Sequence, residues 1–360
     1  MAHKELTEAE VKSAFEQVLA AVGAVEVTDR YNNVAARAGF NLILSFLEGD
    51  QTEVRERFWK LFDFYCSVIP LQRMVWWWRG APKPFGGKLA QAQLHELKDK
   101  ARSPDYAIDL KMGSDIPAGD PSGSRQWEMQ AKEHFFNAWV NNSEGIWDHD
   151  QFIEPGSGPC PSFVRICLPV SWILGGGDTA GFVKHAVELM QPRWATAGWA
   201  IVPHPAEEIG GQSQAQQRIF PWLERFPGLD AIDYGSLMEQ AFNAAMPSIN
   251  WLNFVSDPLL DKLGGREQVR AKVEASEFLS CKDVGNCLMI QAGPFPSLSD
   301  THHGLPGAPG FGEAARLLKP IRVKGVLNSF VSSTGSHGPD DLNWQRECEQ
   351  WFSRFDRFGL

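Results

Sequence analysis

The sequence predicts an α+β fold, in which mixed or antiparallel sheets are flanked by helices. Apolar residues recur at helical spacing in some stretches and alternate with polar residues in others, as they do in half-buried strands. Several predicted strands also follow one another without a helix between them. The 360 residues are 43% hydrophobic and 22% charged, with no apolar run of about 18 residues. This composition excludes disordered, fibrous and membrane-spanning classes of protein.

The chain opens with a predicted helix, strand, helix and strand. Thr7 and Glu10 form a capping box ahead of apolar residues at helical spacing, and Gly23 is a natural end for this first helix. The elements that follow are a buried strand at 39–47, a helix capped by Asp50 with Glu53 and ended by Pro70, and a strand at 74–78.

A second strand–helix–strand unit is predicted further along the chain. Its parts are an alternating strand at 162–172, a glycine break at 175–177, a helix capped by Asp178 or Thr179 and ended by Pro192, and a strand at 195–202. The same number of positions separates Phe40 from Trp76 in the first unit and Phe163 from Trp199 in the second. Two related β-α-β halves would produce this spacing, and so would coincidence in an α/β chain.

The remaining predicted elements surround and follow these units. They are a strand at 106–112, a loop at 113–125, a strand at 132–140, a loop-rich stretch at 141–161, a helix at 236–245, an extended segment at 248–255, a short helix ending at Gly264–Gly265, a helix at 267–276, a strand at 286–292, a Pro/Gly-rich loop at 294–312, and a last helix after Asp341. The loop-rich stretch suggests a boundary between an N-terminal half, residues 1–150, and a C-terminal half, residues 151–360, which can also pack as one continuous domain.

Charge and cysteine content indicate the compartment and the kind of partner. With 34 basic and 44 acidic residues, the net charge is −10. Nucleic acids and anionic membranes would be repelled on average, so a basic protein is the favoured partner, although solubility alone also explains such a charge. The six cysteines form no C-x-x-C pair, and the first residues lack an apolar signal core. We therefore expect a cytoplasmic protein with reduced thiols.

The residue types that carry chemistry do not assemble into a known catalytic or metal motif. The sequence has no phosphate-binding P-loop, no dinucleotide-binding glycine fingerprint, no nucleophile elbow and no H-E-x-x-H helix. The clusters at 148–150 and 300–303 contain histidine and aspartate without the helical spacing that pairs metal ligands. We therefore expect no catalytic residue, no metal and no cofactor.

One stretch of the chain resembles a known family. It runs from Tyr234–Leu237 through the strand-like Ser248–Phe254 to Lys262–Gly265, and the strand leaving into a Gly-Pro loop at Met289–Pro296 also fits. These segments resemble the TsiV-like type VI secretion immunity proteins. The resemblance covers residues 38–322 and involves fold-bearing residues rather than chemical ones.

The resemblance implies an immunity protein that binds and neutralises a cognate effector toxin by occluding its active site, without catalysis. A cytoplasm-acting nuclease or nucleotide-consuming toxin would suit a partner with a charge of −10. The family pattern marks no contact residues, so the candidates come from this sequence alone. They are Trp147, Asp148, Asp150 and Glu154 in one acidic, aromatic loop, and Asp115 and Asp120 in a polar loop.

Two other classes of function stay open at this stage. The first is an enzyme of unrecognised type, such as a hydrolase that uses His149, His204 or His302 from dispersed loops. The second is an assembly component of a secretion machine. The run Trp76–Trp78 would serve as an interface anchor if one sheet face were uncovered, or as core if helices cover both faces. Self-association is left undetermined by the sequence.

Overall fold

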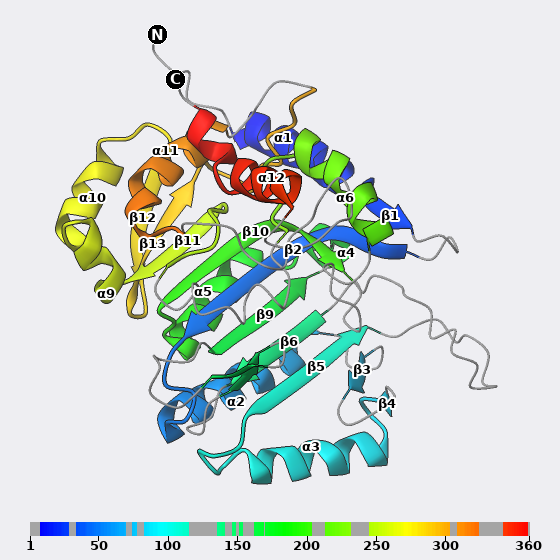
Figure 1. Ribbon diagram of the computed structural model, residues 1–360. Coiled ribbons are helices and arrows are strands. Elements are labelled where there is room, and N and C mark those ends of the chain that lie inside the picture. The colour runs from blue at the N-terminus through cyan, green and yellow to red at the C-terminus, as the bar shows by residue number, and fades with distance from the viewer. Residues whose placement is uncertain are drawn as a thin grey trace.

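The computed structural model of the chain confirms the α+β fold (Figure 1). The residues that it describes are 8–28, 34–69, 74–77, 83–114, 135–140, 146–148, 151–153, 162–168, 170–203, 213–231, 245–302, 308–323 and 341–358.

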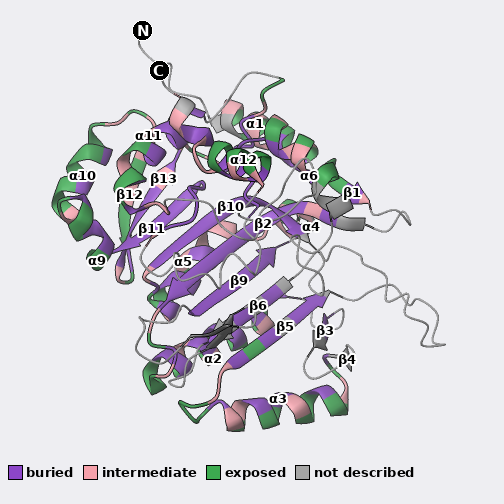
Figure 2. Cartoon of the chain, in the orientation of Figure 1, coloured by how far each residue is buried: buried purple, intermediate pink, exposed green. Residues whose placement is uncertain are grey.

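Within these ranges, 11 strands form one sheet in the order β12-β13-β11-β10-β2-β9-β6-β5-β3-β4, with β1 paired to β2 off this path. The strands are β1 (Glu26–Thr28), β2 (Val34–Phe46), β3 (Met74–Trp77), β4 (Lys83–Pro84), β5 (Ile108–Ser114), β6 (Phe135–Val140), β9 (Ser162–Leu168), β10 (Trp194–Pro203), β11 (Leu252–Ser256), β12 (Leu279–Val284) and β13 (Cys287–Ala292). Each neighbouring pair in this sheet is antiparallel. Figure 2 shows that the central strands are buried along most of their length.

The described helices surround this sheet. They are α1 (Glu8–Gly23), α2 (Thr52–Val68), α3 (Lys88–Lys100), α4 (Val170–Leu174), α5 (Thr179–Met190), α6 (Ser213–Arg225), α9 (Asp257–Leu260), η3 (Asp261–Leu263), α10 (Arg266–Glu274), α11 (Ala308–Leu318), η4 (Lys319–Ile321), α12 (Leu342–Phe352) and η5 (Arg354–Arg357). The helices α2 and α5 lie side by side, joined by the stacked rings of Phe64 and Phe182 with centroids 5.1 Å apart. Phe58, Phe62 and Tyr65 of α2 pack on Phe136 of β6.

Both predicted strand–helix–strand units are present, but they occupy the sheet differently. Because every neighbouring pair is antiparallel, β9 and β10 run parallel with β2 between them. By the same rule β2 and β3 run parallel, with β9, β6 and β5 between them. The two units therefore share an order of elements and not a position in the sheet. Strands from residues 1–150 and 151–360 share this one sheet, in which β2 lies between β10 and β9, and β9 lies between β2 and β6. The boundary near residue 150 stays a prediction.

Capping side chains explain where two of the predicted helices begin. Asp178 caps α5 by accepting the N–H of Gly181 at 2.8 Å, and Asp341 caps α12 by accepting the N–H groups of Asn343 and Trp344. The cap predicted for α2 was wrong, because the cap position is Gln51, which makes no side-chain bond to the helix.

Two predicted boundaries also need correction. The strand predicted at 162–172 ends at Leu168, and α4 follows it from Val170 to Leu174. The Pro/Gly-rich loop predicted at 294–312 contains the first turns of α11. A Cβ atom at Gly310 would lie 3.0 Å from the backbone of Ala292 and Gly293. This glycine is therefore needed for close packing rather than for a turn.

Other predictions are confirmed in part or concern residues outside the described ranges. The strands at 106–112 and 132–140 correspond to β5 and β6, while β12, α3 and α6 were not predicted. The loop-rich stretch 141–161 contains a short hairpin, described below. The helix predicted at 236–245 lies outside the described residues except at its last position. Of the tryptophan run, β3 includes the backbone of Trp76 and Trp77, and Trp78 lies outside the described residues.

Candidate partner-binding site

Two of the predicted contact residues fall on a small hairpin. Trp147 and Asp148 lie on β7 (Ile146–Asp148), which pairs antiparallel with β8 (Gln151–Ile153) in a sheet of its own. Trp147 is opposite Phe152, and Asp148 is opposite Gln151. The structure therefore brings two of the predicted residues onto one strand. The other four, Asp150, Glu154, Asp115 and Asp120, lie outside the described residues.

The described residues that flank these two stretches lie at opposite ends of the neighbouring strands β5, β6 and β9. Val140 and Ser162, which flank the stretch containing the hairpin, lie at the end where β6 stops and β9 starts. Ser114 and Phe135 flank the stretch containing Asp115 and Asp120, and they lie at the other end of the same strands. The strand register thus gives no support for treating the six predicted residues as one contiguous patch.

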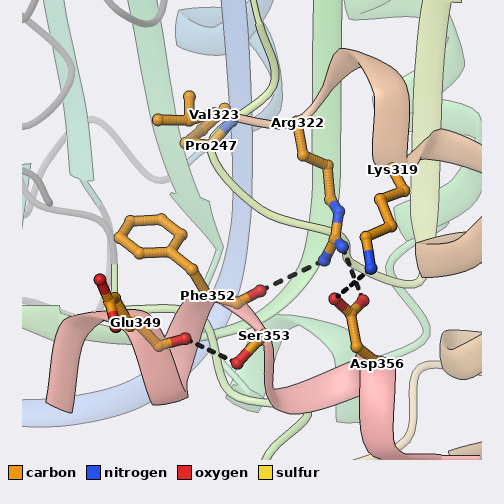
Figure 3. A pocket seen from close by; sticks show the side chains of 8 residues that line it. All are labelled: Pro247, Lys319, Arg322, Val323, Glu349, Phe352, Ser353 and Asp356. Atoms are coloured by element: carbon orange, nitrogen blue, oxygen red, sulfur yellow. Dashed lines mark hydrogen bonds and ion pairs between the residues drawn. The ribbon is translucent and has the colours of Figure 1, made fainter. Parts of the chain in front are cut away.

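A separate cavity of about 370 Å³ opens between η4 and the C-terminal helices (Figure 3). Its lining residues combine apolar and charged groups, and they are Pro247, Lys319, Arg322, Val323, Glu349, Phe352, Ser353 and Asp356. A short parallel bridge builds one wall: the N–H of Met246 donates to the carbonyl of Ile321 at 2.8 Å, and the N–H of Val323 donates to the carbonyl of Met246 at 2.8 Å.

Two cations and one carboxylate form an ion group at one end of this cavity. Arg322 donates through Nη2 to Asp356 Oδ1 at 2.6 Å and through Nη1 to the carbonyl of Phe352 at 3.2 Å. Lys319 Nζ lies 3.4 Å from the other oxygen of Asp356. The side chain of Arg322 is 10% exposed and that of Lys319 is 65% exposed. Sequence reasoning missed this cavity, because its residues come from three distant segments and form no motif.

The histidines in the described part of the chain occupy exposed positions. His95 is exposed, and its Nε2 lies 3.3 Å from Asp99 Oδ2 on the same helix. His185 is exposed as well, and its Nδ1 lies 3.8 Å from Glu188 Oε2 on its own helix. Among all the described residues, no group of three or more His, Cys, Asp or Glu side chains is placed to hold a metal ion. His302 is exposed and its backbone N–H donates to Asp300, whereas His149 and His204 lie outside the described residues.

The described cysteines are free thiols, and three of them are held in the protonated form. Burial raises the pKa of Cys66, Cys167 and Cys287 to about 12, mainly because desolvation penalises the thiolate. The thiolate is the nucleophilic and metal-binding form of cysteine, so these side chains serve the core rather than chemistry.

This environment predicts slow alkylation of the folded protein. A pKa raised to about 12 lowers the thiolate fraction at pH 8 by about a thousandfold relative to an exposed cysteine. Brief treatment with iodoacetamide at pH 8 should leave Cys66, Cys167 and Cys287 unmodified in the folded chain and modify them in urea, as measured by peptide mass spectrometry. Rapid labelling of Cys167 in the folded chain would contradict this assignment.

The comparison with protein families identifies the family of this chain, which the chemistry of the described residues does not. Residues 128–355 match the family described as TsiV, type VI immunity for VRR-NUC. This match extends over more than half of the chain. The chain belongs to the TsiV family of type VI immunity proteins. The resemblance stated from the sequence is thereby confirmed, and both the hairpin β7–β8 and the C-terminal cavity, apart from Asp356, lie within the matched residues.

Solved structures show the same fold for this TsiV member. A Pseudomonas aeruginosa type VI secretion (T6SS) protein, PA0821, is similar with a TM-score of 0.68 and 17% sequence identity, over 95% of this chain and 90% of that chain. At this identity the similarity shows the fold. Comparison with curated proteins gives no match. None of the described helices has the length and apolar content needed to cross a membrane.

Proposed function

We propose that this TsiV protein binds a cognate type VI effector with a VRR-NUC domain and neutralises it by covering the effector's active site. The match of residues 128–355 to a family of type VI immunity proteins carries this proposal. The neutralisation requires no turnover by the immunity protein, only a stable complex. We further propose that it acts in the cytoplasm, where a nuclease effector would meet its nucleic-acid substrate.

The net charge supports a nuclease as the partner. A protein that binds nucleic acid presents Lys and Arg side chains to the phosphates, so its substrate groove is basic. A chain with a charge of −10 is attracted to such a groove, and this attraction accelerates encounter between the two proteins. Aromatic side chains buried on contact would then slow dissociation, since most affinity differences arise in the off-rate.

The hairpin β7–β8 and its surroundings are the proposed contact surface. The backbone places Trp147 and Asp148 on the same short strand, outside the hydrogen bonding of the main sheet. Together with Asp150 and Glu154, they combine an aromatic anchor with three carboxylates in a short stretch of sequence. Asp115 and Asp120 remain candidates for a second, independent contact.

The decisive test is co-expression with the effector encoded beside this protein. We expect the effector alone to arrest growth, co-expression to restore it, and the two proteins to purify together at a defined stoichiometry. Restored growth without a complex would contradict binding as the mechanism. A cognate effector that hydrolyses the cell wall in the periplasm would contradict the proposed cytoplasmic action.

Reversing two charges of the hairpin tests the contact surface. In the double variant Asp148→Lys with Asp150→Lys, the association rate with the effector should fall about tenfold at low salt and depend less on salt concentration, because favourable steering is lost. Surface plasmon resonance at several ionic strengths measures both quantities. The matched control is Glu274→Lys with Glu277→Lys, an equal charge change at exposed positions in and just after α10. Equal losses in both variants would exclude a specific role for the hairpin.

A further inference from the structure

The ion group in the C-terminal cavity holds more positive than negative charge. Within the described part of the chain, Lys319 and Arg322 share the carboxylate of Asp356. Arg322 is almost fully buried, and no described residue provides a hydrogen-bond acceptor for its Nε atom. A buried donor without an acceptor is costly, and two cations that share one carboxylate are only partly neutralised. This end of the cavity therefore favours an additional carboxylate.

The rest of the cavity indicates which kind of chemical group would carry this additional carboxylate. Pro247, Val323 and Phe352 form an apolar wall next to the ion group (Figure 3). Lys319 is largely exposed, so the cationic end is reachable from the surface. Glu349 is also exposed, and Figure 3 shows it on the far side of Phe352 from the Lys319–Asp356 pair. The arrangement fits a short apolar stem that ends in a carboxylate.

We propose that this cavity binds a carboxylate on an apolar stem, supplied by an acidic side chain of the bound effector. The identity of the donor rests on the proposed function, whereas the carboxylate preference rests on the cavity itself. A basic nuclease also carries acidic residues, and an acidic residue that enters this cavity would fix the orientation in which the two proteins dock. Lys319 contributes the accessible positive charge. Arg322 is the buried cation that holds Asp356 in place.

The first experiment tests the chemistry without the effector. Glutamate with both termini capped, and capped glutamine as the neutral control, are titrated into the isolated protein while NMR chemical shifts are followed. We expect capped glutamate to shift signals of residues around the cavity, capped glutamine not to, and Lys319→Met to weaken binding at least tenfold. Arg316→Met removes a similarly exposed arginine from α11 outside the cavity and should leave the binding unchanged. Glu349→Gln removes a like charge and should leave the affinity equal or higher.

The second experiment tests the source of the carboxylate. Lys319→Met should weaken binding of the cognate effector about tenfold, and Arg316→Met should not. Failure of capped glutamate to bind would overturn the carboxylate site, whatever the effector does. Binding of capped glutamate with no effect of Lys319→Met on the effector would overturn the effector as donor and indicate a free small acid. Absence of any effector binding to the unmodified protein would instead contradict the proposed function, while the first experiment would still decide the site.

Discussion

Replacing Arg354 by methionine is expected to lower the free energy of unfolding by about 3–5 kcal/mol. Arg354 is buried, and its guanidinium donates to the carbonyl of Pro227 at 2.8 Å, the carbonyl of Trp351 at 3.0 Å and the hydroxyl of Ser248 at 3.0 Å. The guanidinium carbon Cζ of Arg354 also lies 3.7 Å from the ring centroid of Trp351. Methionine fills a similar space but leaves three buried acceptors without these donors.

The electrostatic surroundings of Arg354 add to this loss. Desolvation by burial lowers the pKa of Arg354, and the nearby carboxylate of Asp230 opposes that change. Asp230 is itself buried, so removing the cation leaves a carboxylate with less compensation in a medium of low dielectric constant.

Urea unfolding followed by tryptophan fluorescence measures the effect. Arg316→Met serves as the control, because this arginine is half exposed and pairs only weakly with Glu313 at 4.0 Å, so its loss should cost less than about 0.5 kcal/mol. A loss of under about 1 kcal/mol for Arg354→Met would show that this network does not stabilise the C-terminal helices. Arg354→Lys should be intermediate, since it keeps the charge without the planar fork of donors.

Replacing Gly228 by alanine is expected to cost about 3 kcal/mol or more, through overpacking. A Cβ atom at this position would lie 2.9 Å from the carbonyl carbon and oxygen of Leu298 and closer still to the carbonyl oxygen of Ser297. These are backbone atoms, so relief requires the two segments to separate. That separation would stretch the hydrogen bond from Gly228 N–H to Leu298 O, which is 2.9 Å long.

Gly86→Ala provides the matched comparison for this substitution. Apart from its two chain neighbours, no described residue has an atom within 4 Å of the Cβ position at Gly86, so alanine should change stability there by less than about 0.5 kcal/mol. Thermal unfolding of the two variants side by side measures the difference. Equal midpoints would show that the chain segments around Gly228 can move apart at little cost, contrary to the packing described.

Local patterns were sufficient wherever one segment determines its own structure. The apolar spacing of Phe182, Val183 and Val187 with the cap at Asp178 predicted α5, and all three side chains are buried in one face of that helix. The apolar positions of α12 were predicted in the same way. Glycine misled the prediction of α11, because the sequence does not show that Gly310 meets the backbone of Ala292 and Gly293.

The candidate site was predicted less completely than the fold. Aromatic and acidic residues in a loop are a general signal for recognition, and of those predicted the structure describes Trp147 and Asp148. No local signal marks the C-terminal cavity, because Pro247, Arg322 and Asp356 are brought together only by the packing of η4 against the last helices.

The sequence by itself determined the α+β class, the limits of several helices, the membership of the TsiV family and the acidic character that favours a basic partner. These properties depend on periodicity, capping and composition, which are local or summed along the chain. Only the tertiary structure decided that β2 lies between β9 and β10, and that two cations share Asp356 beside an apolar wall. Both arise from contacts between residues far apart in sequence, whose pairing depends on how all the segments pack at once.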